Sequence, residues 1–191
     1  LKLENETVIT AVNAGAITNK CMQYASGNVY DADKNSHFIH NEKLDALESL
    51  QMNLNGAPLL VGYHYIPTRE AILKRFPMAE LLPSDKRQKE VEDRWNAGKI
   101  PMLVVHPSSA GHGLDLQHGG HNLCIVDPYW DFEMYAQLIE RIGPVRQMQA
   151  GYDRLVHVYR LRAIHTFDDV VIDRLTTKAS VESAVRGAMI Q

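Results

Sequence analysis

The chain has 191 residues, 45% of them hydrophobic and 23% charged, which is enough for one globular domain with its own core. The formal net charge of −3 argues against a protein that holds nucleic acid by bulk positive charge alone. No apolar run approaches the length that crosses a bilayer, and the first ten residues, with two glutamates, do not form a secretory signal. We therefore expect no membrane partner.

Cysteine usage and the first residue add two expectations. Cys21 and Cys124 stand about half a chain apart, and neither belongs to a disulfide or metal-binding pattern. This usage favours a reduced, cytoplasmic protein. Because the chain begins at Leu1 without a methionine, we expect it to be a piece of a longer polypeptide.

Helical and strand patterns alternate from residue 41 onwards. Apolar residues at three- and four-residue spacing predict a helix over 41–54, and an Asn-Gly-Ala-Pro turn follows it. Apolar, β-branched or aromatic runs then predict four buried strands, over 59–65, 102–105, 123–126 and 155–159. Helical patterns lie between the strands, over 68–76, 86–97 and 132–142.

The two ends of the chain are less regular. Residues 166–169 predict a capped helix start, with a second helix running from beyond Leu175 to the C-terminus. The first forty residues carry mixed patterns, and we assign no elements there. The alternation in between predicts an α/β fold, with a mostly parallel sheet flanked by helices.

Two segments carry candidate chemistry, and the first follows the strand over 102–105. Residues 106–117 are rich in small residues and glycines, which let a backbone approach a phosphate closely. A tight turn that needs glycine for steric reasons explains the same composition equally well.

The second segment is the helix over 132–142 and its continuation. Gln137 and Arg141 stand four residues apart and share one helix face, and arginine meets phosphate oxygens two at a time. Five arginines against one aspartate lie between Arg141 and Arg162, which suits an arginine-lined phosphate site. A solvated helix with an internal Gln–Arg contact is the plainer alternative.

In order and spacing, the two segments together resemble the fifth and sixth motifs of superfamily 2 helicases of the Swi/Snf type, particularly compact phage and bacterial members. Residues 109–116 match a Ser-Ala-Gly-x-Gly-Leu-Asn-Leu motif at all positions but the Asn, where Asp115 stands. In the sixth motif Gln137 and Arg141 match, Pro144 stands where a second arginine belongs, and the Gly-Gln ending becomes Arg146-Gln147. The resemblance covers residues 20–185, including Thr166 and Asp168 at the start of a brace helix.

This resemblance implies the C-terminal RecA-like lobe of an ATP-dependent DNA helicase or translocase. It implies catalytic arginine fingers at Arg141 and, less directly, Arg146, since Arg146 lies two residues beyond the family position. Nucleotide contacts would come from Gly113, Asp115 and Gln137. Nucleic-acid contacts would come from Tyr63, His64, Ser108, Ser109 and Gly111, and the family habit is double-stranded DNA.

The resemblance also implies a division of the chain and a missing partner. Residues 1–40 would lead in from a first RecA-like lobe, 41–165 would form the C-terminal lobe, and 166–191 would form brace helices. The sequence contains no Gly-x-x-x-x-Gly-Lys-Ser/Thr motif. ATP and Mg²⁺ would therefore be held mainly by the first lobe of the same polypeptide, in the cytoplasm of a bacterial or phage-infected cell, and the isolated chain would be inactive.

Three other interpretations stay open. His106, His112, His118 and His121 lie within sixteen residues, but their spacing matches no familiar zinc signature, so we expect no metal. A small α/β enzyme could use a serine nucleophile beside a histidine, although no Gly-x-Ser-x-Gly elbow is present. A catalytically inactive nucleic-acid- or protein-binding domain on a helicase-like fold is the third.

Overall fold

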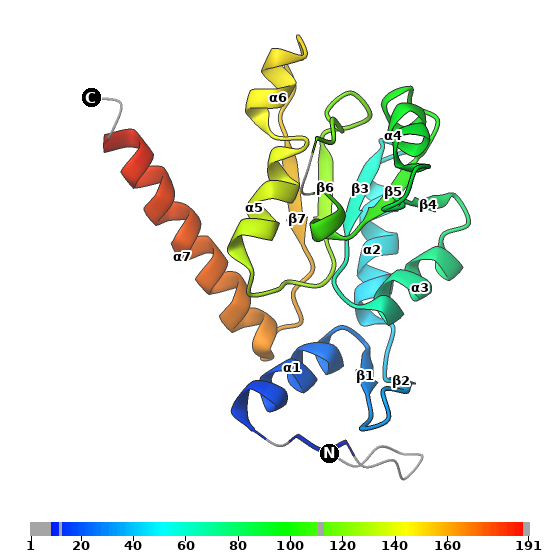
Figure 1. Cartoon of the computed structure of the whole chain (residues 1–191), viewed down its shortest axis with the longest axis vertical. Coiled ribbons are helices and arrows are strands. Elements are labelled where there is room, and N and C mark those ends of the chain that lie inside the picture. Colours follow the sequence, from blue (N-terminus) through cyan, green and yellow to red (C-terminus); the bar gives the residue numbers. More distant parts are fainter. Residues whose placement is uncertain (1–8, 12, 111–112, 189–191) are drawn as a thin grey trace.

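The computed structural model describes residues 9–11, 13–110 and 113–188 (Figure 1). In that part of the chain, five strands form one parallel sheet in the order β4-β5-β3-β6-β7. These strands are β3 (Leu59–Gly62), β4 (Ala79–Leu81), β5 (Met102–Val105), β6 (Asn122–Ile125) and β7 (His157–Arg160). The fold is therefore the α/β class with a parallel sheet flanked by helices, as the sequence predicts.

Helices connect the strands and cover both faces of this sheet (Figure 1). They are α2 (Glu42–Asn53), α3 (Ile66–Arg75), α4 (Gln88–Asn96), α5 (Phe132–Glu140), α6 (Pro144–Gln149) and α7 (Phe167–Ala188), with a short 3₁₀ helix η1 (Pro107–Ala110) after β5. Parallel strands require such crossovers, and each crossover helix buries its apolar stripe on the sheet.

Alternate residues of the central strands enter two separate cores. One core joins residues such as Leu60 and Leu103 to Trp95 of α4, Leu138 of α5 and Val171 of α7. The other core joins the intervening strand residues to side chains of α2 and α3. The strands are buried on both faces, which explains why they read as continuous apolar runs rather than alternating ones.

A helix and a hairpin precede the sheet, in a segment whose sequence shows no clear pattern. Helix α1 (Ala14–Ala25) is capped by Asn13, whose side chain accepts a hydrogen bond from the Ala16 N–H. Strands β1 (Asn28–Tyr30) and β2 (Ser36–Phe38) pair antiparallel. Helix α1 packs beside α7, and the Tyr65 hydroxyl donates to the side-chain oxygen Oδ1 of Asn19 at 3.1 Å, which joins this segment to the end of β3.

The C-terminal prediction is right at its start and wrong beyond it. The Thr166 side-chain oxygen accepts from the Asp168 N–H, as a helix cap does. However, one continuous helix, α7, replaces the two helices that the sequence predicts. Figure 1 shows α7 leaving the body of the fold, with its first turns on the core.

A buried ion pair connects α7 to the helix that opens the sheet. Lys43 Nζ of α2 lies 2.7 Å from Asp168 Oδ2, and their side chains are only 5% and 1% exposed. The same Asp168 oxygen accepts the Ala163 N–H at 2.9 Å. These contacts fix where α7 begins relative to the sheet.

Candidate nucleotide and nucleic-acid sites

Two arginines converge on one backbone carbonyl, at the end of the sheet where β6 and β7 begin. Arg141, at the C-terminus of α5, directs Nη1 to the Leu114 carbonyl oxygen at 3.5 Å. Arg146 of α6 directs its own Nη1 to the same oxygen at 3.3 Å and forms an ion pair with Asp115. Of the five arginines in the basic segment, these two meet at one point; Arg154, Arg160 and Arg162 bond elsewhere.

The two arginines share their site with neighbouring carboxylates. Burial lowers the pKa of the Arg141 guanidinium, and the neighbouring charge of Arg146 lowers it further, whereas Glu140 and Asp115 oppose the shift. An arginine remains charged at neutral pH despite such a shift. Two guanidinium groups and the carboxylates of Asp115 and Glu140 therefore meet here, and the planar, paired donors of a guanidinium suit an anionic ligand such as phosphate.

Helix α4 holds the segment that receives the arginines. The buried Glu92 carboxylate accepts the Asp115 N–H at 3.2 Å, and Asn96 donates to the Asp115 carbonyl at 2.6 Å. Trp95, fully buried, donates its indole N–H to the Leu116 carbonyl at 2.8 Å. Gly119 packs so closely against Trp95 that an added Cβ would lie 2.3 Å from the indole nitrogen. These anchoring roles of α4 are not evident from the sequence and come from the structure.

Gln147 fixes α6 against the same segment. Its side chain is 1% exposed, and its Nε2 donates to the carbonyls of Gln117, Gly120 and Ile142 at 3.2, 3.0 and 3.0 Å. Its Oε1 accepts from Arg154 Nε at 2.8 Å. The glutamine that the sixth-motif ending retains is thus a structural side chain that places Arg146.

The remaining predicted nucleotide contacts are more loosely placed. Gly113 has a φ of +73°, a conformation that favours glycine, and lies immediately before the Leu114 carbonyl. Gln137 is exposed on α5, one turn before Arg141, with its backbone carbonyl accepting the Arg141 N–H at 3.3 Å. Pro144 begins α6 after Gly143, so the missing second arginine position is a helix start.

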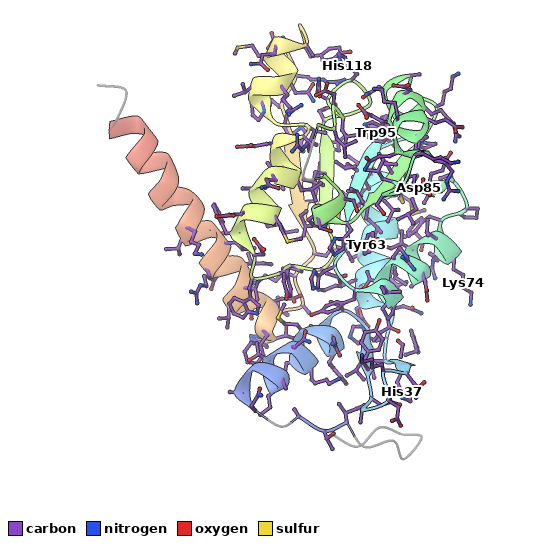
Figure 2. The ribbon with its side chains drawn as sticks, viewed as in Figure 1. His37, Tyr63, Lys74, Asp85, Trp95 and His118 are labelled. Carbon is purple, nitrogen blue, oxygen red and sulfur yellow. The ribbon has the colours of Figure 1, made fainter. Side chains whose placement is uncertain are left out.

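A second cluster lies at the opposite edge of the sheet, where β3, β5 and β6 end. His64 stacks on Tyr129, with ring centroids 3.5 Å apart, and lies 5.6 Å from the His106 ring. Tyr63 is 7% exposed and packs its ring edge-on against His106 in the core. Figure 2 labels Tyr63 and Trp95, which mark the two edges. Of the pair Tyr63 and His64, only His64 has appreciable surface in this structure.

Asp127 organises this edge. Its Oδ2 accepts the backbone N–H groups of His64 and Tyr65 at 3.0 and 3.1 Å. Desolvation lowers the pKa of His64 to about 4, although the Asp127 charge opposes the shift. His64 is therefore neutral near pH 7, and its contact with a nucleic acid would be a stacking or hydrogen-bonding one rather than a charged one.

The two predicted serines lie beside this cluster. Ser108 Oγ lies 2.6 Å from His106 Nδ1, which also accepts the Ser108 N–H at 3.2 Å. Ser109 donates its N–H to the His106 carbonyl at 2.9 Å. This contact is local to η1, and the Asp127 carboxylate bonds to backbone N–H groups rather than to the His106 ring, so a serine–histidine–aspartate triad is not assembled. Gly111 lies outside the described residues.

His118 and His121 bind protein groups. His118 Nδ1 lies 3.1 Å from the Tyr152 hydroxyl, and His121 Nδ1 lies 2.6 Å from the Leu155 carbonyl. Within the described ranges, no group of three His, Cys, Asp or Glu side chains could hold a metal ion. His112 falls outside those ranges.

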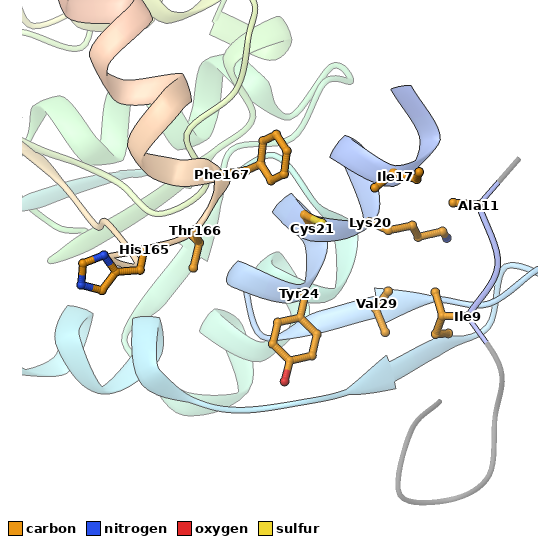
Figure 3. A pocket seen from close by; sticks show the side chains of 10 residues that line it. All are labelled: Ile9, Ala11, Ile17, Lys20, Cys21, Tyr24, Val29, His165, Thr166 and Phe167. Carbon is orange, nitrogen blue, oxygen red and sulfur yellow. The ribbon is translucent and has the colours of Figure 1, made fainter. Parts of the chain in front are cut away.

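A cavity of about 530 Å³ lies between α1, β1 and the start of α7 (Figure 3). It shares no lining residue with either cluster. Its lining is mainly apolar, with contributions from Ile17, Tyr24 and Phe167. Of the described lining residues, Lys20 is the one Lys or Arg, and its ammonium donates to the Tyr30 carbonyl at 2.6 Å.

The fold is that of a RecA-like lobe, and solved ATPase and helicase domains share it. The chain superposes on the C-terminal part of the Fun30 ATPase domain with a TM-score of 0.57 and 17% identity, over 69% of this chain and 44% of that one. It superposes on the helicase domain of Pyrococcus furiosus Hef with a TM-score of 0.52 and 18% identity, over 70% and 27%.

Sequence comparison finds a phage relative. Protein p41 of Acyrthosiphon pisum secondary endosymbiont phage 1 is 44% identical over 185 residues, which cover 96% of this chain and 40% of p41. The chain thus spans about two fifths of the length of this relative. No family model matches the chain. Across the described residues, no helix is both long and apolar enough to cross a membrane.

Proposed function

We propose that this chain is the second motor lobe of an ATP-dependent DNA helicase or translocase of the Swi/Snf type. The observation that carries the proposal is the convergence of Arg141 and Arg146 on the Leu114 carbonyl, in a lobe with a helicase-like fold. In such motors an arginine from the opposing lobe stabilises charge on the transferred phosphate. Gly113, Asp115 and Gln137 would line the nucleotide side of this site.

The nucleic acid, for which we propose double-stranded DNA, would follow the other edge. Ser108, Ser109 and the backbone near Gly111 would contact phosphates there, and His64 would add a neutral contact, with Tyr63 supporting its neighbours from the core. Contacts of this kind position a protein on nucleic acid without reading its sequence. The separation of the two clusters allows nucleotide and DNA to be held at the same time.

The partner would be a first RecA-like lobe in the same polypeptide, which would hold ATP and Mg²⁺. Residues 1–40 would lead from that lobe, 41–165 would form the second lobe, and 166–191 would brace it. The site that this chain supplies contains arginines but no lysine-bearing phosphate loop, which supports the division of labour. The setting would be the cytoplasm of a bacterial or phage-infected cell.

A catalytically inactive binding domain is the second candidate, because Asp115 already neutralises Arg146. ATP turnover, measured with and without double-stranded DNA on the full-length protein and on the 191-residue chain, separates the two. A motor gives DNA-stimulated turnover in the full-length protein and none in the chain alone. Absence of turnover in the full-length protein contradicts the motor function.

A further inference from the structure

The backbone of Asp115 is hydrogen-bonded to α4, whereas its side-chain carboxylate pairs with Arg146. Its N–H is bonded to buried Glu92 and its carbonyl to Asn96, so α4 sets its position independently of its side chain. The side chain makes the ion pair with Arg146. An Asp115→Asn change therefore alters the contact with Arg146 while these backbone anchors remain.

The ion pair lies where another anion can replace it. The side chains of Arg146 and Asp115 are 30% and 59% exposed, in contrast to the buried pair between Lys43 and Asp168. The second contact of Arg146, to the Leu114 carbonyl, leaves its charge unbalanced if Asp115 moves away. Beside it, the charge of Arg141 adds to the attraction for an incoming phosphate.

We propose that Asp115 is a positioning residue that holds Arg146 in the empty lobe and competes with nucleotide phosphate for it. This inference rests on the proposed function. Binding of ATP would exchange the carboxylate of Asp115 for a phosphate oxygen on the same guanidinium, and the exposed Asp115 side chain would turn to solvent. The lobe would thus keep its arginine ordered, at the cost of a higher ATP concentration for half-saturation.

The size of the effect follows from the exposure of the pair. Exposed ion pairs of this kind contribute at most about a fivefold factor to an equilibrium. In the full-length protein, Asp115→Asn should lower the KM for ATP by up to about fivefold, with the change falling on KM rather than kcat. Asp115→Glu, which retains the charge, should have a KM near that of the wild type.

Two controls make this test specific. Asp33→Asn removes one negative charge from the exposed turn between β1 and β2 and should leave KM unchanged. In an Arg146→Ala background, Asp115→Asn should no longer lower KM, because the competition acts through Arg146. An unchanged KM in Asp115→Asn, or an equal decrease in the Arg146→Ala background, overturns the inference.

The role of Asp115 can be tested even if the proposed motor function fails. If the full-length protein does not turn over ATP, binding of tripolyphosphate to the 191-residue chain still tests Asp115, with the Arg146 Nε–H signal followed by NMR. Tighter binding by Asp115→Asn than by wild type supports the competition even then. Equal binding, or no binding by either, overturns it.

Discussion

Replacing Gln147 with leucine tests how the structure places Arg146. Leucine is similar in size but cannot donate to the Gln117, Gly120 and Ile142 carbonyls. The Gln117 carbonyl keeps a hydrogen bond from Arg154 Nη2 at 2.6 Å, which leaves two carbonyls that lose their bond to this side chain. A buried polar group left without its partner costs about 1–3 kcal/mol, so for two carbonyls we expect a loss of about 2–6 kcal/mol in the free energy of unfolding.

Urea unfolding of the 191-residue chain measures this loss as a lower midpoint at unchanged slope. Gln149→Leu is the matched control, because Gln149 is exposed on the same helix, and it should change stability by no more than about 0.5 kcal/mol. A loss below about 1 kcal/mol for Gln147→Leu would mean that the amide does not hold α6 in place.

Three further predictions concern stability and can be checked by the same unfolding measurement. Lys43→Met should cost about 3–5 kcal/mol because it strands the buried Asp168 carboxylate, and adding Asp168→Asn should recover part of the loss; an uncoupled pair would contradict this. Trp95→Ala should cost about 3–5 kcal/mol through the cavity it leaves, and a much smaller cost would mean that the segment over 114–120 is not anchored there. The pKa of His64 falls from 6.5 in the unfolded chain to about 4 in the folded chain, so the unfolded chain takes up a proton first and stability decreases as pH falls from 6.5 to about 4. His64→Gln should make this decrease in stability shallower, and an unchanged slope would contradict the shift.

The central sheet is predictable from the sequence because its strands are buried on both faces. The runs over 59–65 and 102–105 contain β3 and β5, and the run over 123–126 differs from β6 by one residue at each end. The short edge strand β4 was not predicted, since its three half-buried residues show no apolar run. Near β7, the apolar run begins at Leu155, which is 78% exposed, and the strand itself begins at His157.

The sequence selects candidate site residues but does not indicate how they are arranged, and their roles stay a prediction. Spacing and resemblance selected Arg141, Arg146 and Asp115, but nothing local indicates that both arginines reach the Leu114 carbonyl, because residues about thirty positions apart make that contact. The anchoring by Glu92 and Asn96 depends on tertiary packing in the same way. The burial of Tyr63 could not be predicted either, because a position at a strand end does not reveal whether the ring enters the core.

The arginine-finger role is tested most directly by the effect of Arg141→Ala on DNA-stimulated ATP turnover by the full-length protein. The proposed role as an arginine finger predicts a decrease in kcat of about 10³-fold or more. Arg162→Ala, which removes an arginine bonded to Asp169 at the start of α7, should retain turnover near the wild-type level. Undiminished turnover in Arg141→Ala would contradict the proposal that this arginine acts on the nucleotide.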